Sequence, residues 1–351
     1  MKNSIGQFMA DLKHAIQEFE ESKIMEEIVP RKFNNQNVNE NQDMEGLTQC
    51  LSVPLYDLLD RGGKRIRPYF CMLIADLFLQ SRKLVYEVAG CVEIIHNGTL
   101  IIDDIEDSSK VRRNDQCIHI KYGLDVAANA SSYAYFAPLQ YFLNKTKYSN
   151  EMKLKILQIC IQNMTEAHLG QAWDIKWHRS TDYIPTEEQY IKMVGFKTGA
   201  LLKIPALLSC AVLGIDDQIA DKLSNFAEKL GVAFQIQDDI LNLIGNEKYK
   251  NTKGYLGEDI NEGKLTLIVI HSLSKNKGRL LEILNSRPED QKVIDEAIKI
   301  IQSTGSLEYA QKKSEEILQS ALKDIDQINF ENLEGKQKLR NLALFLIQRN
   351  Y

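Results

Sequence analysis

Two short acid-rich segments carry the residue types best suited to metal chemistry. The first, LIIDDIEDSSKVRR, spans residues 100–113, and in a helix its Asp103 and Asp107 lie one turn apart with Asp104 beside them. Mg²⁺ prefers carboxylate oxygens and commonly joins a few of them to substrate phosphates. For this motif alone, a solvated acidic helix end is the alternative. The preceding apolar run, residues 100–102, favours a helix that carries the acids from the core to a cavity rim.

The second segment, FQIQDDILN at residues 234–242, repeats this arrangement. Asp238 and Asp239 follow an apolar helical run, and Asn242 lies one turn beyond Asp238. One such motif is weak, but two on apolar helices in one chain are not readily explained as surface charge. Acid clusters on facing helices would hold metal ions around one anionic group.

Basic residues follow the first motif and occur in three further segments. Arg112 and Arg113 come directly after the acids, and arginine beside a carboxylate–metal site suits diphosphate recognition. Glycine–lysine pairs are common in turns, so each further segment alone is more often structural, and none has the Walker-A spacing. The segments are GGKRIRP (62–68), with Lys64 and Arg67 expected one helical turn apart, FKTGA (196–200) with Lys197 and Thr198, and GEDINEGK (257–264) with Lys264 and, upstream, Lys253.

The elements that must position these groups are predicted to be helices. Apolar residues recur at steps of three and four, without alternating strands, and long helices are expected over residues 89–102, 153–169 and 220–242. Pro54, Pro68 and Pro185 fall where helices should start or stop. We therefore predict an all-α, single-domain helical bundle with a central apolar cavity. The predicted boundaries are 1–50 for an N-terminal helix with an Asn-rich loop and 51–351 for the helical domain.

Composition narrows the function classes. The 351 residues are 44% hydrophobic and 26% charged with a net charge of −5, which argues against nucleic-acid binding and against disorder. Six scattered cysteines without a C-x-x-C pair predict reduced thiols rather than a zinc site. The N-terminus lacks a signal-like apolar region, and the longest apolar stretch, Leu201–Ile215, is too short to span a bilayer. A cytoplasmic location without a transmembrane segment is expected.

Six motifs, in this order along the chain, resemble the trans-prenyltransferase family of short-chain polyprenyl diphosphate synthases. The likeness covers about residues 54–309 and is strongest to geranylgeranyl diphosphate synthases, with PTEEQYIKMV (185–194) and GSLEYAQ (305–311) in addition. It implies a helical bundle of the isoprenoid synthase type, Mg²⁺ as cofactor and a homo-oligomer. The six motifs are GGKRIRP, IHNGTLIIDDIEDSSKVRR, GQAWDIKW, KTGAL, FQIQDDILN and GEDINEGK.

The resemblance also implies a role for each matching residue. Magnesium is bound by Asp103, Asp107 and Asp238, with Asp104 and Asp239 in support. These three ligands, with Lys197 and Lys264, form the expected catalytic set. The diphosphate of isopentenyl diphosphate is held by Lys64, Arg67, His96 and Arg113, and that of the allylic substrate by Arg112, Lys197, Thr198, Gln235, Lys253 and Lys264. By itself, His96 would be read as a satisfied, half-buried helix histidine.

Three positions depart from the commonest family pattern. Asn114 replaces the glycine usual after the arginine pair, and Leu265 replaces a basic or small residue. Asn242 stands where many relatives have a third aspartate, and a neutral amide predicts weaker metal affinity there.

The implied reaction is the magnesium-dependent head-to-tail (1′-4) condensation of isopentenyl diphosphate with dimethylallyl, geranyl or farnesyl diphosphate. Gly98 and Thr99 are small and lie about one turn deeper than Asp103, so they do not close a tunnel near its mouth. Tyr135, Phe136 and His168 resemble tunnel-floor positions, with plain core packing as the alternative. We expect geranylgeranyl diphosphate as the product; farnesyl or longer products are the alternatives.

Two other functions fit the same motifs less well. A class I terpene cyclase has no second substrate and should not need Lys64, Arg67 and His96 together with Arg113. A non-catalytic regulatory subunit would usually have lost acids from one motif, and both are intact here.

Overall fold

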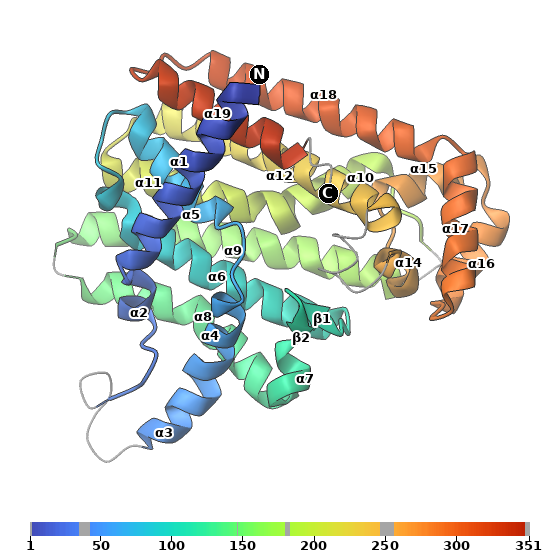
Figure 1. The fold of residues 1–351 in the computed structure, drawn as a ribbon, viewed down its shortest axis with the longest axis horizontal. Coiled ribbons are helices and arrows are strands. Elements are labelled where there is room, and N and C mark those ends of the chain that lie inside the picture. Colours follow the sequence, from blue (N-terminus) through green and yellow to red (C-terminus); the bar gives the residue numbers. More distant parts are fainter. Residues whose placement is uncertain (1, 35–42, 146, 180–182, 246–255, 348–351) are drawn as a thin grey trace. The chain divides into compact units, whose positions relative to one another are not determined.

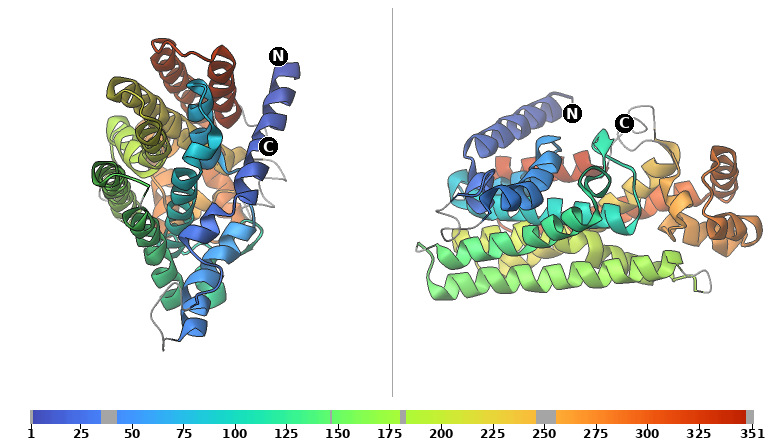
Figure 2. Two further views of the ribbon diagram at one scale, coloured as in Figure 1. Left: turned by 90° about the vertical axis from the view of Figure 1, so that its left-hand side faces the viewer. Right: turned by 90° about the horizontal axis from the view of Figure 1, so that it is seen from below.

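The computed structural model describes residues 2–34, 43–145, 147–179, 183–245 and 256–347. Helices make up almost all of this part of the chain, so the all-α prediction is confirmed (Figures 1 and 2). The domain boundary near residue 50 and the central cavity stay predictions. The chain divides into two compact units: unit 1 (Met1–Cys160, Ile204–Ala220, Phe330–Asn341) and unit 2 (Ile161–Lys203, Asp221–Asn329, Leu342–Tyr351).

Unit 1 contains the acidic motif of residues 103–107 and the basic segment GGKRIRP. Its elements are α1 (Lys2–Glu21), α2 (Ile24–Ile28), α3 (Met44–Leu47), the π-helical turn η1 (Thr48–Ser52), α4 (Val53–Asp60), α5 (Ile66–Leu77), the 3₁₀ turn η2 (Arg82–Val85), α6 (Tyr86–Glu106), β1 (Val111–Arg112), β2 (Asp115–Gln116), α7 (Ile118–Tyr122) and α8 (Leu124–Asn144).

Unit 2 contains the second acidic motif and the segments FKTGA and GEDINEGK. Its own elements are α10 (Glu187–Val194), the π-helical turn η3 (Gly195–Gly199), α14 (Glu258–Glu262), α15 (Leu267–Lys275), α16 (Gly278–Ser286), α17 (Gln291–Ser303) and α18 (Ser306–Asp326). Four helices contribute residues to both units: α9 (Asn150–Arg179), α11 (Ala200–Leu213), α12 (Asp217–Ile244) and α19 (Leu333–Ile347).

The three long helices predicted from apolar periodicity are present as α6, α9 and α12, each extending beyond its predicted ends. The prolines mark helix starts as expected. Pro54 lies in the first turn of α4 and Pro68 in the first turn of α5, where a missing backbone N–H costs nothing. Pro185 directly precedes Thr186, which caps α10.

In unit 1, α6 packs against α5 and α8, and α1 lies along α5. Two phenylalanines of α1 are fully buried: Phe8 meets the ring of Tyr69 edge-on at 5.9 Å, and Phe19 meets Tyr86 at the same centroid distance. Each such side chain contributes roughly 1.5–3 kcal/mol through burial. The N-terminal helix, for which the sequence suggested no role, is therefore part of this core.

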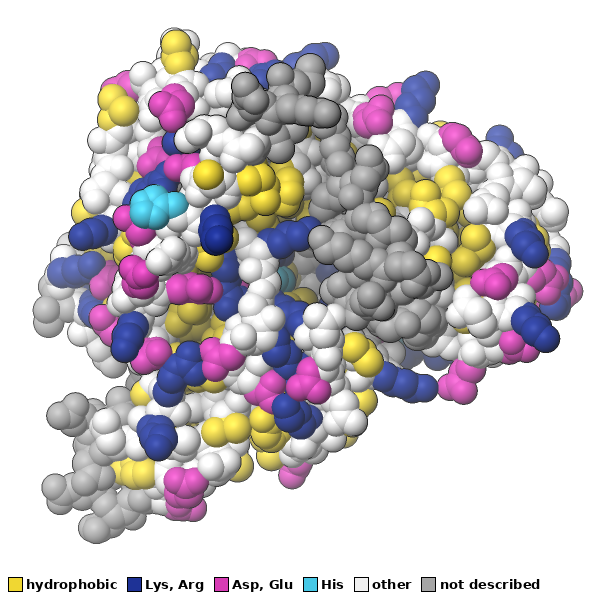
Figure 3. Space-filling model, in the orientation of Figure 1, with side chains coloured by type: hydrophobic (Ala, Val, Ile, Leu, Met, Phe, Trp, Pro, Cys, Tyr) yellow, Lys and Arg dark blue, Asp and Glu magenta, His cyan; other side chains and the backbone are white. Residues whose placement is uncertain are grey.

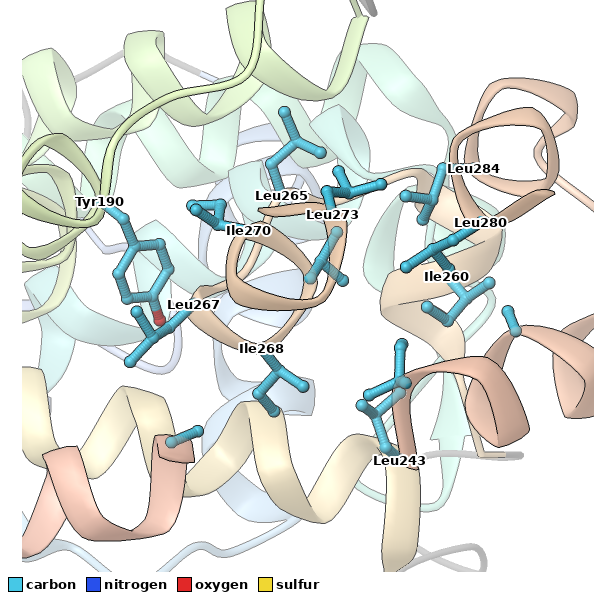
Figure 4. Packing of buried hydrophobic residues seen from close by; sticks show 14 of the residues in the cluster. Tyr190, Leu243, Ile260, Leu265, Leu267, Ile268, Ile270, Leu273, Leu280 and Leu284 are labelled. Carbon is cyan, nitrogen blue, oxygen red and sulfur yellow. The ribbon is translucent and has the colours of Figure 1, made fainter. Parts of the chain in front are cut away.

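In unit 2, α15 forms the centre of the core. Leu267, Ile268 and Leu273 from this helix are buried among side chains of the surrounding helices (Figure 4). Those neighbours are Tyr190 of α10, Leu243 of α12, Ile260 of α14, and Leu280 and Leu284 of α16. The helices that carry Tyr190, the second acidic motif and the GEDINEGK segment therefore pack against one hydrophobic core.

Two helical segments are long and apolar enough to cross a membrane by composition alone. They are Arg82–Glu106 and Glu187–Leu213, and their most apolar windows are 72% and 61% buried inside the protein. The apolar stretch Leu201–Ile215 was judged too short to span a bilayer. This argument does not hold, because the helical segment that contains most of it begins at residue 187. Their burial, rather than their length, marks these segments as core helices.

The surface adds little to stability. Acidic and basic side chains are interspersed over the face seen in Figure 3. Arg31 makes a two-pronged contact with Asp60 at 2.7 and 2.8 Å, and Arg279 pairs with Glu296 at 2.8 Å. Exposed pairs of this kind contribute about 1 kcal/mol or less.

The six cysteines are free thiols, five of them buried, as predicted.

Candidate active site

The first acidic motif lies at the end of α6, as predicted. Asp107 caps this helix, and its N–H donates to the carbonyl of Asp103 at 2.9 Å, which places the two acids one turn apart. Asp104 is different, because its side chain is fully buried. Its Oδ1 accepts a hydrogen bond from Arg112 Nε at 2.8 Å. Asp104 therefore orients Arg112, and its supporting role beside the two other acids stays a prediction.

A tight hairpin follows this motif and adds one pair of short strands to the all-α fold. The two-residue strands β1 and β2 pair antiparallel, with Arg112 opposite Asp115. The two residues between them, Arg113 and Asn114, have φ of 53° and 63°, as in a type I′ turn. Glycine suits such a position, and asparagine is the side chain that tolerates it best. The departure at Asn114 therefore preserves the turn that presents Arg113.

The side chains of Arg67 and Arg113 lie close enough to His96 for their charges to act on it, and we call this cluster of three residues the arginine pocket. Burial lowers the pKa of Arg67 to about 10, and burial with neighbouring arginines lowers the pKa of Arg113 to about 10, although Glu93 opposes both shifts. Burial thus disfavours the charged form of both side chains, and a bound anion would favour it.

His96 lies within the same field of charge. Burial, together with the positive charges of Arg67 and Arg113, holds the pKa of His96 well below its usual value. Its buried Nδ1 has no hydrogen-bond partner among the described residues. The reading of His96 as a satisfied helix histidine is therefore wrong. A neutral imidazole with an unused ring nitrogen can still donate to or accept from a ligand, depending on its tautomer.

A buried chain of hydrogen bonds holds Arg113. Its Nη1 donates to the Asn97 side-chain oxygen at 3.0 Å, and Asn97 donates to Glu93 Oε1 at 3.0 Å. Glu93 also accepts from Arg65 at 2.9 Å. Arg65 lies in GGKRIRP with a left-handed φ of 46° and was missed from the sequence. Lys64 lies in the loop before α5 rather than on the helix that carries Arg67, so these two are not one helical turn apart.

In unit 2, the predicted Lys197 and Thr198 lie on the π-helical turn η3. A methyl group built on Gly231 of α12 would lie 2.8 Å from Gly199 Cα, so only glycines allow these two backbones to approach so closely. This approach brings Thr198 to Gln235. Lys197 Nζ pairs with Asp174 at 2.7 Å. Although burial opposes it, Lys197 lowers the pKa of Asp174.

Four side chains form a hydrogen-bonded series that we call the tyrosine–acid chain. Thr198 Oγ1 donates to Gln235 Oε1 at 3.0 Å, and Gln235 Nε2 donates to Asp239 Oδ1 at 2.9 Å. Tyr190 donates its hydroxyl to Asp239 Oδ2 at 2.5 Å. Burial raises the pKa of Asp239 to about 6 despite these donors, and the charge of Asp238 adds to the shift. Asp238 itself is half-buried on the same helix.

The GEDINEGK segment adds an acid that sequence reasoning missed. Burial, with further contributions from Asp239 and Glu262, raises the pKa of Asp259 well above its usual value, although Lys264 opposes the shift. Asn242 anchors this segment to α12: its carbonyl accepts from Gly257 N at 2.8 Å and its side chain from Asp259 N at 3.2 Å.

That anchoring accounts for one departure from the family pattern, since Asn242 has a structural task that needs no charge. Leu265 is buried in the core of unit 2, which accounts for another. Two of the residues that sequence reasoning missed lie in recognised motifs: Asp174 in GQAWDIKW and Tyr190 in PTEEQYIKMV. The motifs did not indicate which residue each side chain would contact. Lys253 lies outside the described residues.

The residues predicted to set chain length are in different environments. A methyl group on Gly98 would lie 2.9 Å from Ala134 Cβ and 3.1 Å from the Ser131 carbonyl, so Gly98 is needed for close packing of α6 on α8. Thr99 is half-buried and Tyr135 packs beside Gly98. Phe136 is 68% exposed, and His168 is also exposed. The assignment of these side chains to a tunnel floor stays a prediction.

The acids suit a metal that is shared with a substrate. Among the described residues no cluster of three or more aspartate, glutamate, histidine or cysteine side chains is close enough to hold an ion by itself. Mg²⁺ typically takes only one or two protein carboxylates and completes its shell with water and phosphate oxygens. The raised pKa values of Asp239 and Asp259 show buried acids that crowd one another, which a cation would relieve. The residues present therefore fit Mg²⁺ bound together with a diphosphate.

A sequence model of the polyprenyl synthetase family matches residues 48–301. The chain therefore belongs to this family, and it is a prenyltransferase. A short chain isoprenyl diphosphate synthase of Methanocaldococcus jannaschii is 37% identical over 257 residues, which cover 72% of this chain and 76% of that protein.

A geranylgeranyl diphosphate synthase of Saccharolobus solfataricus is 32% identical over 321 residues, which cover 90% of this chain and 95% of the relative. The fold is also that of known structures. The crystal structure of a geranylgeranyl pyrophosphate synthetase from Pyrococcus horikoshii matches with a TM-score of 0.83 at 25% identity, over 98% of this chain and 99% of the other.

Proposed function

We propose that this chain catalyses the magnesium-dependent head-to-tail (1′-4) condensation of isopentenyl diphosphate with an allylic diphosphate, and that its product is geranylgeranyl diphosphate. The observation that carries the proposal is the arginine pocket. Its buried cations and the unpartnered Nδ1 of His96 suit a diphosphate held by side chains alone. A terpene cyclase, which takes one substrate, has no use for this pocket in addition to the acidic motifs.

In this mechanism the two substrates are held by different residues. Arg67, His96 and Arg113 hold isopentenyl diphosphate, with Lys64 in the adjacent loop contributing a further charge. The allylic diphosphate is held by a second set of side chains, namely Arg112, Lys197, Thr198, Gln235 and Lys264, with Lys253 as predicted from the sequence.

Asp103, Asp107 and Asp238 would hold Mg²⁺. When bound, Mg²⁺ neutralises the charge that develops on the departing pyrophosphate. Lys197 and Lys264 stabilise the same charge directly, and Asp174 holds Lys197 in place through an ion pair. No side chain is needed as the final base, because the departed pyrophosphate accepts the proton.

The proposed product length rests on the relatives and on α6. Geranylgeranyl diphosphate synthases from Saccharolobus solfataricus and Sulfolobus acidocaldarius are 32% and 30% identical to this chain, and a geranylfarnesyl diphosphate synthase from Natronomonas pharaonis is 30% identical. Thr99 leaves room one turn before Asp103. Thr99→Phe should therefore shorten the product, and Tyr135→Ala with Phe136→Ala should lengthen it.

One assay tests the proposal. Purified protein is incubated with isopentenyl and dimethylallyl diphosphates and Mg²⁺, and the products are identified by chain length. Geranylgeranyl diphosphate is expected. Farnesyl diphosphate as the final product under excess isopentenyl diphosphate contradicts the product assignment. A cyclic hydrocarbon would identify a cyclase, and no turnover would identify a regulatory subunit.

We also propose a homo-oligomer in a reducing, cytoplasmic compartment. The free thiols support the compartment, because disulfides persist mainly in oxidising ones. Leu143 on α8 and Leu154 on α9 are exposed apolar side chains, which supports self-association of unit 1. Light scattering after gel filtration tests this, with a monomeric mass as the contrary result.

A further inference from the structure

The donor and acceptor roles along the tyrosine–acid chain follow from Asp239, which accepts two of its hydrogen bonds. Each side-chain oxygen of Asp239 accepts one hydrogen bond from a neighbouring side chain. Tyr190 supplies one at 2.5 Å and the amide nitrogen of Gln235 supplies the other at 2.9 Å. The Gln235 amide is thereby oriented, with its oxygen toward Thr198, whose hydroxyl must be the donor in that pair.

This orientation of the Gln235 amide leaves one N–H group of its nitrogen as a donor. Gln235 Nε2 has two hydrogens, and one of them is used on Asp239. The second is the one that remains for a phosphate oxygen. If the amide were flipped, its oxygen would face the Asp239 carboxylate and the donor would be lost.

Tyr190 is suited to maintaining this state. Its side chain is 2% exposed and belongs to the core of unit 2, and α10 begins with a complete capping box between Thr186 and Gln189. From this fixed position its hydroxyl donates to Asp239 Oδ2. The position of this donor is therefore set by packing rather than by substrate.

We propose that Tyr190 is a positioning residue: by holding Asp239 through one carboxylate oxygen, it fixes the Gln235 amide in the orientation that binds the allylic diphosphate. The inference rests on the proposed function, since it assigns Gln235 to that substrate. Tyr190 touches no reacting atom in this scheme and acts through Asp239.

The test uses Tyr190→Phe, which keeps the ring and removes only the hydroxyl. Tyr309→Phe is the matched control, because Tyr309 lies in the same unit and its hydroxyl donates to a different carboxylate, that of Glu187. Binding of an unreactive allylic thiolodiphosphate is measured by calorimetry with and without Mg²⁺. The KM for each substrate and the thermal midpoint are measured in parallel.

For Tyr190→Phe, the dissociation constant of the analogue in the presence of Mg²⁺ should rise about tenfold, the change expected from one hydrogen bond to a charged group. The KM for isopentenyl diphosphate should stay within about twofold of wild type. Tyr309→Phe should leave both values unchanged. Equal weakening of both substrates in step with a lower thermal midpoint would show that Tyr190 is only a structural residue.

A second variant keeps the inference testable if Tyr190→Phe folds poorly. Asp239→Asn replaces one of the two carboxylate oxygens that accept these hydrogen bonds, so alone it should weaken the analogue about as much, and in a double-mutant cycle the double variant should add little more. Additive losses would overturn the inference. If wild-type protein neither binds the analogue nor turns over, the proposed function fails instead, so the two failures are distinguishable.

Discussion

The arginine pocket of unit 1 and the tyrosine–acid chain of unit 2 carry buried charge of opposite sign. In the pocket, burial lowers the pKa of Arg67 and Arg113 to about 10. In unit 2, burial raises the pKa of Asp239 to about 6 and also raises that of Asp259. Burial penalises the charged form in both places, so each is relieved by a ligand of opposite charge.

This difference in the sign of the charge indicates how each region binds a diphosphate. Excess positive charge accepts an anion directly. The acidic residues of unit 2 repel an anion until a cation has bound. Lys197 and Lys264 reduce this repulsion. We therefore expect isopentenyl diphosphate to bind without Mg²⁺ and the allylic diphosphate to depend on it.

The largest expected effect comes from removing a metal-binding acid. Asp238→Asn and Asp103→Asn should each lower kcat about 100-fold or more, because metal-assisted stabilisation of the leaving group is lost. Asp217→Asn in the first turn of α12 is the matched control, since Asp217 forms only an exposed pair with Lys155. Near-normal turnover of either variant at saturating Mg²⁺ would falsify the metal assignment.

The next effect separates the two substrates. Arg67→Ala should raise the KM for isopentenyl diphosphate and Lys197→Ala that for the allylic substrate, each about 10- to 100-fold, since a charge-assisted phosphate contact contributes about 1.5–3 kcal/mol. Steady-state kinetics with each substrate varied in turn gives both values. Arg279→Ala serves as the control, because Arg279 lies on the surface in pairs with Glu282 and Glu296. Equal effects of both changes on both substrates contradict the comparison.

A smaller effect concerns the packing that supports the pocket. Gly98→Ala should lower the free energy of unfolding by about 1–3 kcal/mol, because the added methyl meets Ala134 and the Ser131 backbone. Chemical denaturation measures this. In the control Gly6→Ala, nothing lies within 4 Å of the new methyl, and stability should rise slightly. Unchanged stability of Gly98→Ala, with an altered product length instead, would show that Gly98 acts through the tunnel alone.

The smallest effect is a pH dependence of the ligand-free protein. The pKa of His96 is held below its unfolded value of about 6.5, so the unfolded chain binds this proton more readily. The stability contributed by neutral His96 is present above about pH 6.5 and is lost as pH falls. Between pH 6.5 and 5.5 the loss should be about 1 kcal/mol. Denaturation of His96→Gln should lack this part of the acid sensitivity; an identical pH slope in both proteins argues against it.

Local patterns explain why much of the helical architecture was predictable. Residues three and four apart share a helix face, so α6, α9 and α12 were visible from apolar spacing alone. The hairpin at Arg113 and Asn114 was not, because it depends on two left-handed residues that composition does not reveal. The close packing of Gly98 against α8 and the anchoring of a loop by Asn242 were not visible either, because both depend on contacts outside the segment that contains the residue.

By itself the sequence determined the helices, the two acidic motifs and the family, since these depend on residue types at short spacing. Only the tertiary structure decided which charges are buried and which groups hold them. Asp174 meets Lys197 across 23 positions, and Tyr190 meets Asp239 across 49. Dehydration and hydrogen bonding set the charge and orientation of a side chain, and both arise from neighbours that the chain brings together only when it folds.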